Sequence, residues 1–317
     1  MVLQGQGQRR VAVSVDLDGI GCYYRIHGLG LVPPSVRHVV LRRCLPRFAD
    51  LFASHGVKAT FFVVGGDLED DPEARAILAE LARAGHELGN HTHTHPYDFT
   101  RLPRPQMADE IDRAHEAIAA VAGRPPVGFR APGYAINREV LELLLERGYT
   151  YDSSVFPSPP YYVAKALVMG AMRLFGRRSA SLLDDPRALF APRAPYHASP
   201  GRPYRPAKSH GLVEIPIAVT PLARLHVIGT SLILAPEWLR RRMVVASLTQ
   251  SFFNLELHGI DLADAAADQL PPELVARQPD LRRSLAHKLI ALDRTLQAAR
   301  EVAESVTLSA ICSRGTA

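Results

Sequence analysis

Acidic and histidine side chains follow three segments that the sequence predicts as buried strands, at the points where those strands end. Asp16 and Asp18 follow the first segment, His91 and His95 follow the third, and His258 precedes the last helices. The four-residue spacing of His91 and His95 would place both rings on one side of a helical turn. Two imidazoles and one carboxylate form a ligand set suited to Zn²⁺, and also to Co²⁺, Ni²⁺ or Fe²⁺.

Such a ligand set, with further acidic and imidazole groups beside it, has the chemistry of a hydrolytic centre. Three protein ligands leave coordination positions open for water, as in catalytic rather than structural metal sites. A second carboxylate can accept a proton as water attacks a carbonyl, and a further imidazole can protonate a leaving amine. The sequence therefore predicts metal-assisted hydrolysis at a rim shared by several strands.

Alternating strand and helix patterns in the first 150 residues predict how that rim is built. Strands are expected at 11–16, 59–64, 86–91, 127–130 and 149–152, and helices at 36–54, 72–84, 106–121 and 137–147. Later strands are expected at 213–219 and 252–258, and later helices at 236–249 and 281–305. Repeated units of this kind predict a parallel sheet with right-handed crossovers, closed or nearly closed into a barrel. Active sites of such barrels lie at the carboxyl ends of the strands.

The regular alternation is interrupted at about 157–212 by a segment rich in proline and tyrosine. It contains one apolar stretch, 161–175, which carries Lys165 and Arg173 and runs into Arg177 and Arg178. Two interpretations stay open: a helix packed over the barrel mouth, or an amphipathic helix with basic flanks that lies on a membrane. We interpret 1–317 as one domain with this insertion and with C-terminal helices at about 270–305.

Composition excludes several classes of protein. The 317 residues include 37 basic and 32 acidic side chains, and a net charge of +5 is too small to require a nucleic-acid partner. Apolar residues make up 47% and charged residues 22%, which argues against disorder and coiled coil. Three widely spaced cysteines indicate neither a disulfide framework nor a cysteine zinc site. Without a recognisable leader or an apolar run of about 18 residues, we expect a cytoplasmic protein, with peripheral contact at the inner membrane face as an option. The oligomeric state is not indicated.

Five short motifs resemble those of the polysaccharide deacetylases, the NodB-homology domains of carbohydrate esterase family 4, and occur in the order of that family. They are Asp16-Leu-Asp18-Gly19, His91-Thr-His-Thr-His95-Pro96, Arg130-Ala-Pro132-Gly133, Tyr151-Asp152-Ser-Ser154 and Leu257-His258. The resemblance implies a NodB-like distorted (β/α) barrel with about seven parallel strands. It also implies hydrolysis of an N-acyl group, most often N-acetyl, on an amino sugar.

The resemblance further implies a role for each matching residue. It makes Asp18, His91 and His95 the metal ligands, Asp16 the general base, His258 the general acid, Arg130 the residue that orients Asp16 and keeps it ionised, and Asp152 the charge partner of His258. Metal-bound water would attack the acyl carbon, with the aspartate as base and the histidine as acid.

Three departures from the family pattern bear on the substrate. Leu17 separates Asp16 and Asp18, as in a subgroup of small cytoplasmic deacetylases and deformylases that includes enzymes not acting on polymers. Gly133 stands where an aromatic residue is common, and the fourth motif lacks its tryptophan. We therefore expect a metal-dependent N-deacetylase, with Zn²⁺ as the first candidate, acting on a small, glycolipid or lipid-linked amino sugar. The alternatives are a deformylase of a lipid-linked amino sugar, an amidohydrolase on a non-sugar amide, and a non-catalytic carbohydrate- or lipid-binding module on the same fold.

Overall fold

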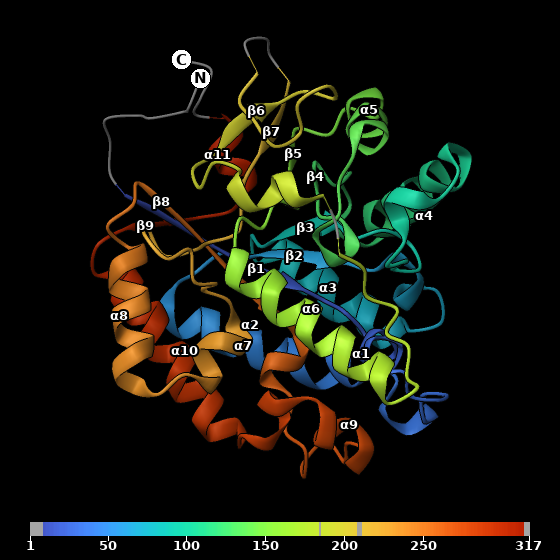
Figure 1. Cartoon of the computed structure of the whole chain (residues 1–317), viewed down its shortest axis with the longest axis vertical. Coiled ribbons are helices and arrows are strands. Elements are labelled where there is room, and N and C mark those ends of the chain that lie inside the picture. Colours follow the sequence, from blue (N-terminus) through green and yellow to red (C-terminus); the bar gives the residue numbers. More distant parts are fainter. Residues whose placement is uncertain (1–8, 184, 208–210, 314–317) are drawn as a thin grey trace.

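A curled, mainly parallel sheet forms the centre of the protein, in a computed structural model that describes residues 9–183, 185–207 and 211–313 (Figure 1). Its strand order is β6-β7-β5-β4-β3-β2-β1-β8, and β9 pairs with β1. The strands are β1 (Arg10–Asp16), β2 (Thr60–Val63), β3 (Glu87–Asn90), β4 (Gly128–Phe129), β5 (Tyr151–Asp152), β6 (Tyr196–Ala198), β7 (Leu212–Glu214), β8 (Phe252–His258) and β9 (Glu304–Val306). Residues 1–8, 184, 208–210 and 314–317 of the predicted domain lie outside the described residues.

The chain after β7 brings the two sides of the curled sheet together. Ala218 N donates to the carbonyl oxygen of Asn254 in β8 at 3.0 Å. Asn254 Nδ2 in turn donates to the carbonyl oxygens of Ile215 at 3.4 Å and Pro216 at 3.3 Å. Together with the parallel pairing of β1, β2, β3, β4, β5, β7 and β8, these bonds confirm the expected distorted barrel of about seven parallel strands.

Helices surround the sheet, and several begin and end where the sequence predicts. They are α1 (Ile20–His27), α2 (Leu45–His55), α3 (Pro72–Arg83), α4 (Arg104–Ala122), α5 (Arg138–Glu146), α6 (Pro159–Leu174), α7 (Gly229–Leu234), α8 (Glu237–Ser247), α9 (Pro272–Arg277), α10 (Leu285–Arg300) and α11 (Ser309–Ser313). The side chain of Asn137 caps α5 by accepting from Val140 N at 2.9 Å. Gly56 ends α2 with φ 61°, a left-handed conformation that glycine adopts without a steric penalty. No helix among these described residues is long and apolar enough to cross a membrane.

The largest hydrophobic core packs the outer helices against β1, β2 and β8. It includes Val13 and Val15 of β1 together with Phe48, Phe52 and Phe61, all fully buried. Removing such a side chain from water contributes about 1.5–3 kcal/mol. The core therefore fixes the strands whose carboxyl ends carry the acidic and histidine residues.

Several elements differ from the sequence-based expectation, among them β6, α7, α9 and α11, which were not expected, and α2, which begins only at Leu45. Helix α1, which follows Asp18 directly, was not expected. The helix expected at 281–305 is shorter, because α10 ends at Arg300 and the chain then forms β9 beside β1. The strand expected at 213–219 pairs regularly only as β7, since Pro216 has no N–H to donate to a ladder.

Candidate active site

A cavity of about 280 Å³ lies at the carboxyl ends of β1, β3 and β8. Its lining includes the five acidic and histidine residues that follow the predicted strands: Asp16, Asp18, His91, His95 and His258. A larger cavity of about 490 Å³ lies against α8 and α10, and none of the predicted site residues line it. The smaller cavity is therefore the candidate active site, in the position expected for a parallel barrel.

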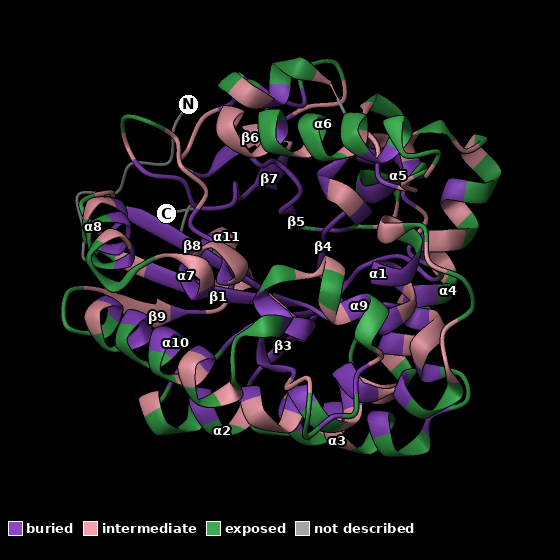
Figure 2. Cartoon of the chain, turned by 60° about the horizontal axis from the view of Figure 1, so that its bottom comes forward, coloured by how far each residue is buried: buried purple, intermediate pink, exposed green. Residues whose placement is uncertain are grey.

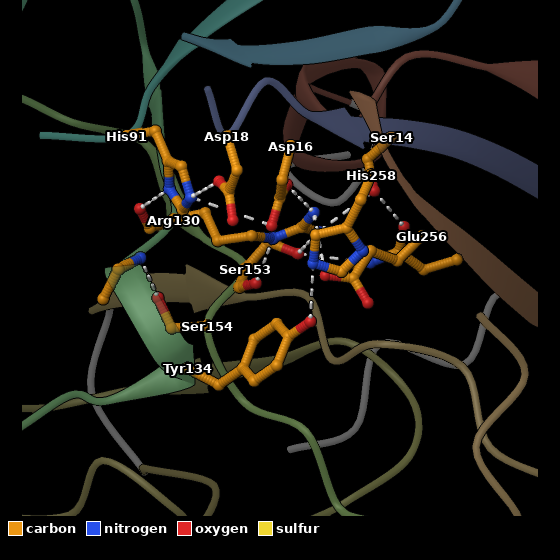
Figure 3. A network of polar contacts seen from close by, with 12 residues as sticks. Ser14, Asp16, Asp18, His91, Arg130, Tyr134, Ser153, Ser154, Glu256 and His258 are labelled. Carbon is orange, nitrogen blue, oxygen red and sulfur yellow. Dashed lines mark hydrogen bonds and ion pairs between the residues drawn. The ribbon is translucent and has the colours of Figure 1, made fainter. Parts of the chain in front are cut away.

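Asp18, His91 and His95 converge on one point at the floor of this cavity. His91 Nε2 lies 3.1 Å from Asp18 Oδ1, and His95 Nε2 lies 3.2 Å from the same oxygen. The two rings meet edge to face with centroids 4.9 Å apart, and all three side chains are buried. The structure thus brings together the three residues to which the resemblance gives the role of metal ligands (Figure 3 shows Asp18 and His91).

The hydrogen bonds of this group fit a bound cation. His91 Nδ1 lies 2.7 Å from the carbonyl oxygen of Arg130, so it must donate there, and a neutral ring then presents the lone pair of Nε2 to Asp18. Both ring nitrogens of His95 are buried without a hydrogen-bond partner among the described residues. Lone pairs that face one another at about 3 Å repel, and a cation between them removes that repulsion.

The protonation states of the group are mostly those that metal binding needs. Burial alone would raise the pKa of Asp18, but His95 and His91 hold it well below its usual range, so this carboxylate is ionised. Burial lowers the pKa of His95, which favours the neutral ring. Burial would also lower the pKa of His91, but Asp16 and Asp18 raise it, so a proton and a cation compete for its Nε2.

An irregular loop, rather than the expected helical turn, brings His91 and His95 together. Asn90 Oδ1 accepts from Thr92 N at 2.8 Å, and Thr92 Oγ1 accepts from His95 N at 3.2 Å. These bonds hold Thr92 at φ 64° and His95 at φ 56°, in the left-handed region that non-glycine residues rarely occupy. Backbone strain of this kind persists where the surrounding structure enforces it, and it is concentrated at functional sites.

A buried guanidinium holds Asp16. Arg130 Nη1 donates to Asp16 Oδ1 at 2.6 Å, and Nη2 donates to Ser14 Oγ at 3.0 Å and to Ser153 Oγ at 2.8 Å (Figure 3). Its plane lies over the Phe62 ring at 4.3 Å from the centroid. Burial would lower the pKa of Arg130, but Asp16 and nearby carboxylates raise it, so the cation persists. This arrangement is the one in which Arg130 would orient Asp16 as the resemblance implies.

His258 lies beside Asp16 and Glu256, and the ligand atoms of these three residues all lie within 4.8 Å of one another. Its Nε2 is 3.3 Å from the Tyr134 hydroxyl, and its backbone N donates to Asp261 Oδ2 at 2.8 Å. Burial would lower the pKa of His258, but Glu256 and the nearby aspartates raise it to about 9. The ring is therefore protonated at neutral pH, as a general acid must be.

Asp152, which the resemblance makes the charge partner of His258, is not placed beside it. Its Oδ1 accepts from Ser154 Oγ at 2.6 Å, and the same hydroxyl accepts from Ala131 N at 2.8 Å. Burial raises the pKa of Asp152, which pairs with the buried Glu214 rather than with a histidine. Asp152 therefore supports the loop that follows Arg130, and Glu256 is the carboxylate beside His258.

Glu256 and Tyr134 belong to the site but were not among the residues that the sequence motifs indicate. Glu256 precedes His258 by two residues in β8, so period-two alternation would have placed both side chains on one face. Tyr134 follows Gly133, the position where an aromatic residue was thought to be lost. With φ 67° it directs its ring into the cavity, where it meets Phe156 at 5.1 Å between centroids. The aromatic wall is thus retained one residue later.

The fold and the site together define a parallel α/β barrel that carries two clusters of acidic and histidine side chains at the carboxyl ends of its strands, one of which fits a metal ion. Residues 38–151 match the sequence model of the family described as polysaccharide deacetylase. The resemblance found in the motifs is thereby confirmed over this region, which is similar to the polysaccharide deacetylases. The matched region contains His91, His95 and Arg130, whereas Asp16, Asp18 and His258 lie outside it.

Curated relatives share part of the chain. A peptidoglycan deacetylase of Helicobacter pylori is 29% identical over 157 residues, which cover 48% of this chain and 52% of that protein. A chitooligosaccharide deacetylase of Rhizobium leguminosarum bv. trifolii is 34% identical over 105 residues, covering 33% and 47% respectively. The chain thus matches about half, or less, of the length of these relatives.

Solved structures share the fold over nearly the whole chain. A Mycobacterium smegmatis protein assigned to the polysaccharide deacetylases superposes with a TM-score of 0.62 at 18% identity, covering 99% of this chain and 92% of that one. A pseudoenzyme of carbohydrate esterase family 4 from Bacillus anthracis gives a TM-score of 0.52 at 13% identity, covering 97% and 66%. Since one of these is a pseudoenzyme, the fold alone does not decide whether this chain is catalytic.

Proposed function

We propose that this protein is a metal-dependent hydrolase that removes an N-acyl group, most often N-acetyl, from an amino sugar. The observation that supports it is the meeting of two different groups of ionisable side chains in one cavity. Asp18, His91 and His95 fit a cation, whereas Asp16 and His258 are placed for proton transfer. Neither group alone would suffice for amide hydrolysis.

The site residues divide the work of hydrolysis between them. Asp18, His91 and His95 would hold a divalent cation, with Zn²⁺ as the first candidate. That cation supplies Lewis acidity toward an acyl carbonyl and lowers the pKa of water.

Proton transfer is the task of the neighbouring residues. Asp16, oriented by the Arg130 guanidinium, accepts a proton from water as it attacks the acyl carbon. Protonated His258 then donates to the nitrogen, so that a neutral amine leaves and acetate remains.

The size of the cavity supports a small acylated unit as the substrate. A volume of about 280 Å³ is near the lower end for ligand cavities, which is enough for one sugar ring and its acyl group. The relatives named above are deacetylases of peptidoglycan and of chitooligosaccharides. We propose that this chain acts on a free, glycolipid or lipid-linked amino sugar, in the cytoplasm or at the inner face of the membrane.

Deformylation is the nearest alternative, because the same residues would process a formyl group in the same way. A non-sugar amide is a second alternative substrate, and a non-catalytic carbohydrate- or lipid-binding module is the alternative from another class. The buried Arg130–Asp16 pair and the protonated His258 argue against the binding module, because binding alone has no use for a base and an acid.

A panel assay tests the proposed function. Metal-replete protein is incubated with N-acetyl and N-formyl amino sugars in free, nucleotide-linked, lipid-linked and oligomeric form, and acetate and formate are measured. We expect acetate from one substrate class, with release about 10²–10⁴-fold slower in Asp16→Asn, which keeps the shape of the side chain but removes the base. Formate alone would establish the deformylase. Silence across the panel, or full activity of Asp16→Asn, would contradict the proposal.

A further inference from the structure

Helix α6 presents an unusually apolar surface to solvent. Only Tyr162 and Met172 of this helix are buried. Leu167 is 69% exposed, Leu174 is 87% exposed, and Phe175, which directly follows the helix, is 81% exposed. Figure 2 shows α6 on the outside of the molecule, exposed along much of its length. Contiguous apolar surface of this kind marks an interaction site in a folded protein.

Positive charge borders this apolar surface. Residues 153–183 contain no aspartate or glutamate, but they carry one lysine and three arginines. Arg173 and Arg178 are exposed near the C-terminal end of α6. Residues 19–37, which meet that end of the helix, also lack acidic side chains. The surface therefore combines apolar area with Arg173 and Arg178, neither of which forms an ion pair with an acidic side chain in the part of the chain that the structure describes.

The opposite face of α6 lines the candidate active site. Tyr161 and Lys165 line the same cavity as Asp18, His91 and His95. The Tyr161 ring contacts Tyr134, with ring centroids 5.9 Å apart. Beyond the C-terminal end of α6, Ala180 N donates to the carbonyl oxygen of Arg25 at 3.2 Å, and Arg177 donates to that of His27. The helix is thus fixed to the body of the protein between the cavity and solvent.

We propose that α6 docks on an anionic membrane surface. Its apolar side chains enter the boundary between headgroups and acyl chains, and its arginines contact lipid phosphates. A helix of 16 residues is about 24 Å long, which suits a position in the plane of the surface. Since the helix lines the cavity, docking would bring the active site to the bilayer. This inference deepens the proposed function, because it would give a lipid-linked amino sugar direct access.

Charge favours a membrane over a second copy of the chain as the occupant. A two-fold dimer through α6 would place the same surface on both sides of the interface. Arginines would then face arginines, with no carboxylate from residues 153–183 to compensate them. Anionic phospholipids supply the missing negative charge and accept the apolar side chains in the same contact.

Vesicle flotation tests the docking surface without requiring turnover. Purified protein is mixed with phosphatidylcholine vesicles, with or without phosphatidylglycerol, and the bound fraction is measured. We expect binding to the anionic vesicles, and about tenfold weaker binding for Leu174→Glu, since one leucine no longer leaves water. Ile290→Glu on α10 is the matched control. The Ile290 side chain has the same size as leucine and is 52% exposed, and this variant should bind as the parent does. Arg173→Glu should reduce the preference for phosphatidylglycerol.

The possible outcomes separate this inference from the proposed function. Absence of vesicle binding, or equal binding by Leu174→Glu and the parent, would overturn the docking surface. So would a parent dimer in light scattering that Leu174→Glu converts to monomers, because a second copy would then occupy α6. Hydrolysis of a water-soluble N-acyl sugar should be the same in both proteins. If the parent protein binds vesicles but does not hydrolyse the soluble sugar, only the proposed function would be contradicted.

Discussion

The candidate site holds two groups of three ionisable side chains that differ in one neighbour. Asp18, His91 and His95 converge on one point. Among the described residues, no lysine or arginine forms an ion pair with Asp18. The ligand atoms of Asp16, Glu256 and His258 also lie within 4.8 Å of one another, but Arg130 Nη1 lies 2.6 Å from Asp16 Oδ1 and 3.9 Å from Glu256 Oε1. In the second group the Arg130 guanidinium supplies the positive charge, whereas the first group would need a bound metal ion to supply it. In the proposed function, similar residue types therefore serve metal binding in one case and proton transfer in the other.

The largest effect is expected from the first group. His95→Ala removes one of three converging ligands, so both metal content and hydrolysis should fall to background. Elemental analysis of dialysed protein and the acetate assay measure the two effects. The comparison between the groups predicts that His258→Ala loses activity, by about 10²–10⁴-fold, but retains its metal. Metal loss in His258→Ala, or full metal content in His95→Ala, would show that the two groups have been assigned the wrong way round.

A smaller effect, with a distinct pH signature, is expected from Glu256→Gln. Acid catalysis needs the protonated ring, so activity should fall as pH rises through the His258 pKa, which is about 9. Burial raises the pKa of Glu256 itself to about 8, so this carboxyl is charged on the alkaline limb of the profile. Removing that charge lowers the His258 pKa, and the alkaline limb should therefore move to lower pH. We expect a decrease of roughly 10–100-fold in kcat/KM at alkaline pH, as is typical for partners of a catalytic group.

Asp152→Asn is the matched control for Glu256→Gln. Asp152 accepts a hydrogen bond from Ser154 and pairs with Glu214 rather than with His258. The alkaline limb of the pH profile of Asp152→Asn should therefore coincide with that of the parent protein. A shift in Asp152→Asn without one in Glu256→Gln would restore the role that the family resemblance implies for Asp152. Thermal melting of both variants shows whether either loss arises from unfolding.

The contrast between Asp152 and Glu256 shows how far the sequence could predict this site. Strands β1 and β8 were predicted closely, because each is a run of buried residues with a polar residue at its carboxyl end. The sequence does not show that the two strands are neighbours, with Asp16 opposite His258. That register decides which carboxylate reaches His258, and it arises only when segments more than 200 residues apart pair.

The grouping of Asp18, His91 and His95 was predicted from residue types, but the backbone conformation of the loop that carries the two histidines was not. A four-residue spacing places two side chains on one side of the chain only when the backbone between them is helical. Here hydrogen bonds to the Asn90 and Thr92 side chains hold Thr92 and His95 in the left-handed conformation instead. Similarly, β9 has few sequence signals, since it forms only because β1 leaves an unpaired stretch beside β2. Both features depend on tertiary contacts rather than on local preference.

The smallest effect is expected from Tyr134→Phe, which sharpens the comparison at a single hydrogen bond. The change removes the hydroxyl 3.3 Å from His258 Nε2 but keeps the ring against Phe156. Because a single hydrogen bond contributes about 1 kcal/mol, kcat should fall by about fivefold, and metal content should not change. Burial and neighbouring carboxylates raise the pKa of Tyr134 well above its usual range, so the hydroxyl itself stays neutral and does not shape the pH profile. Steady-state kinetics of Tyr134→Phe with and without Glu256→Gln distinguish two arrangements. Additive losses would mean that hydroxyl and carboxylate act on His258 separately, whereas a smaller combined loss would place both in one network that positions the ring.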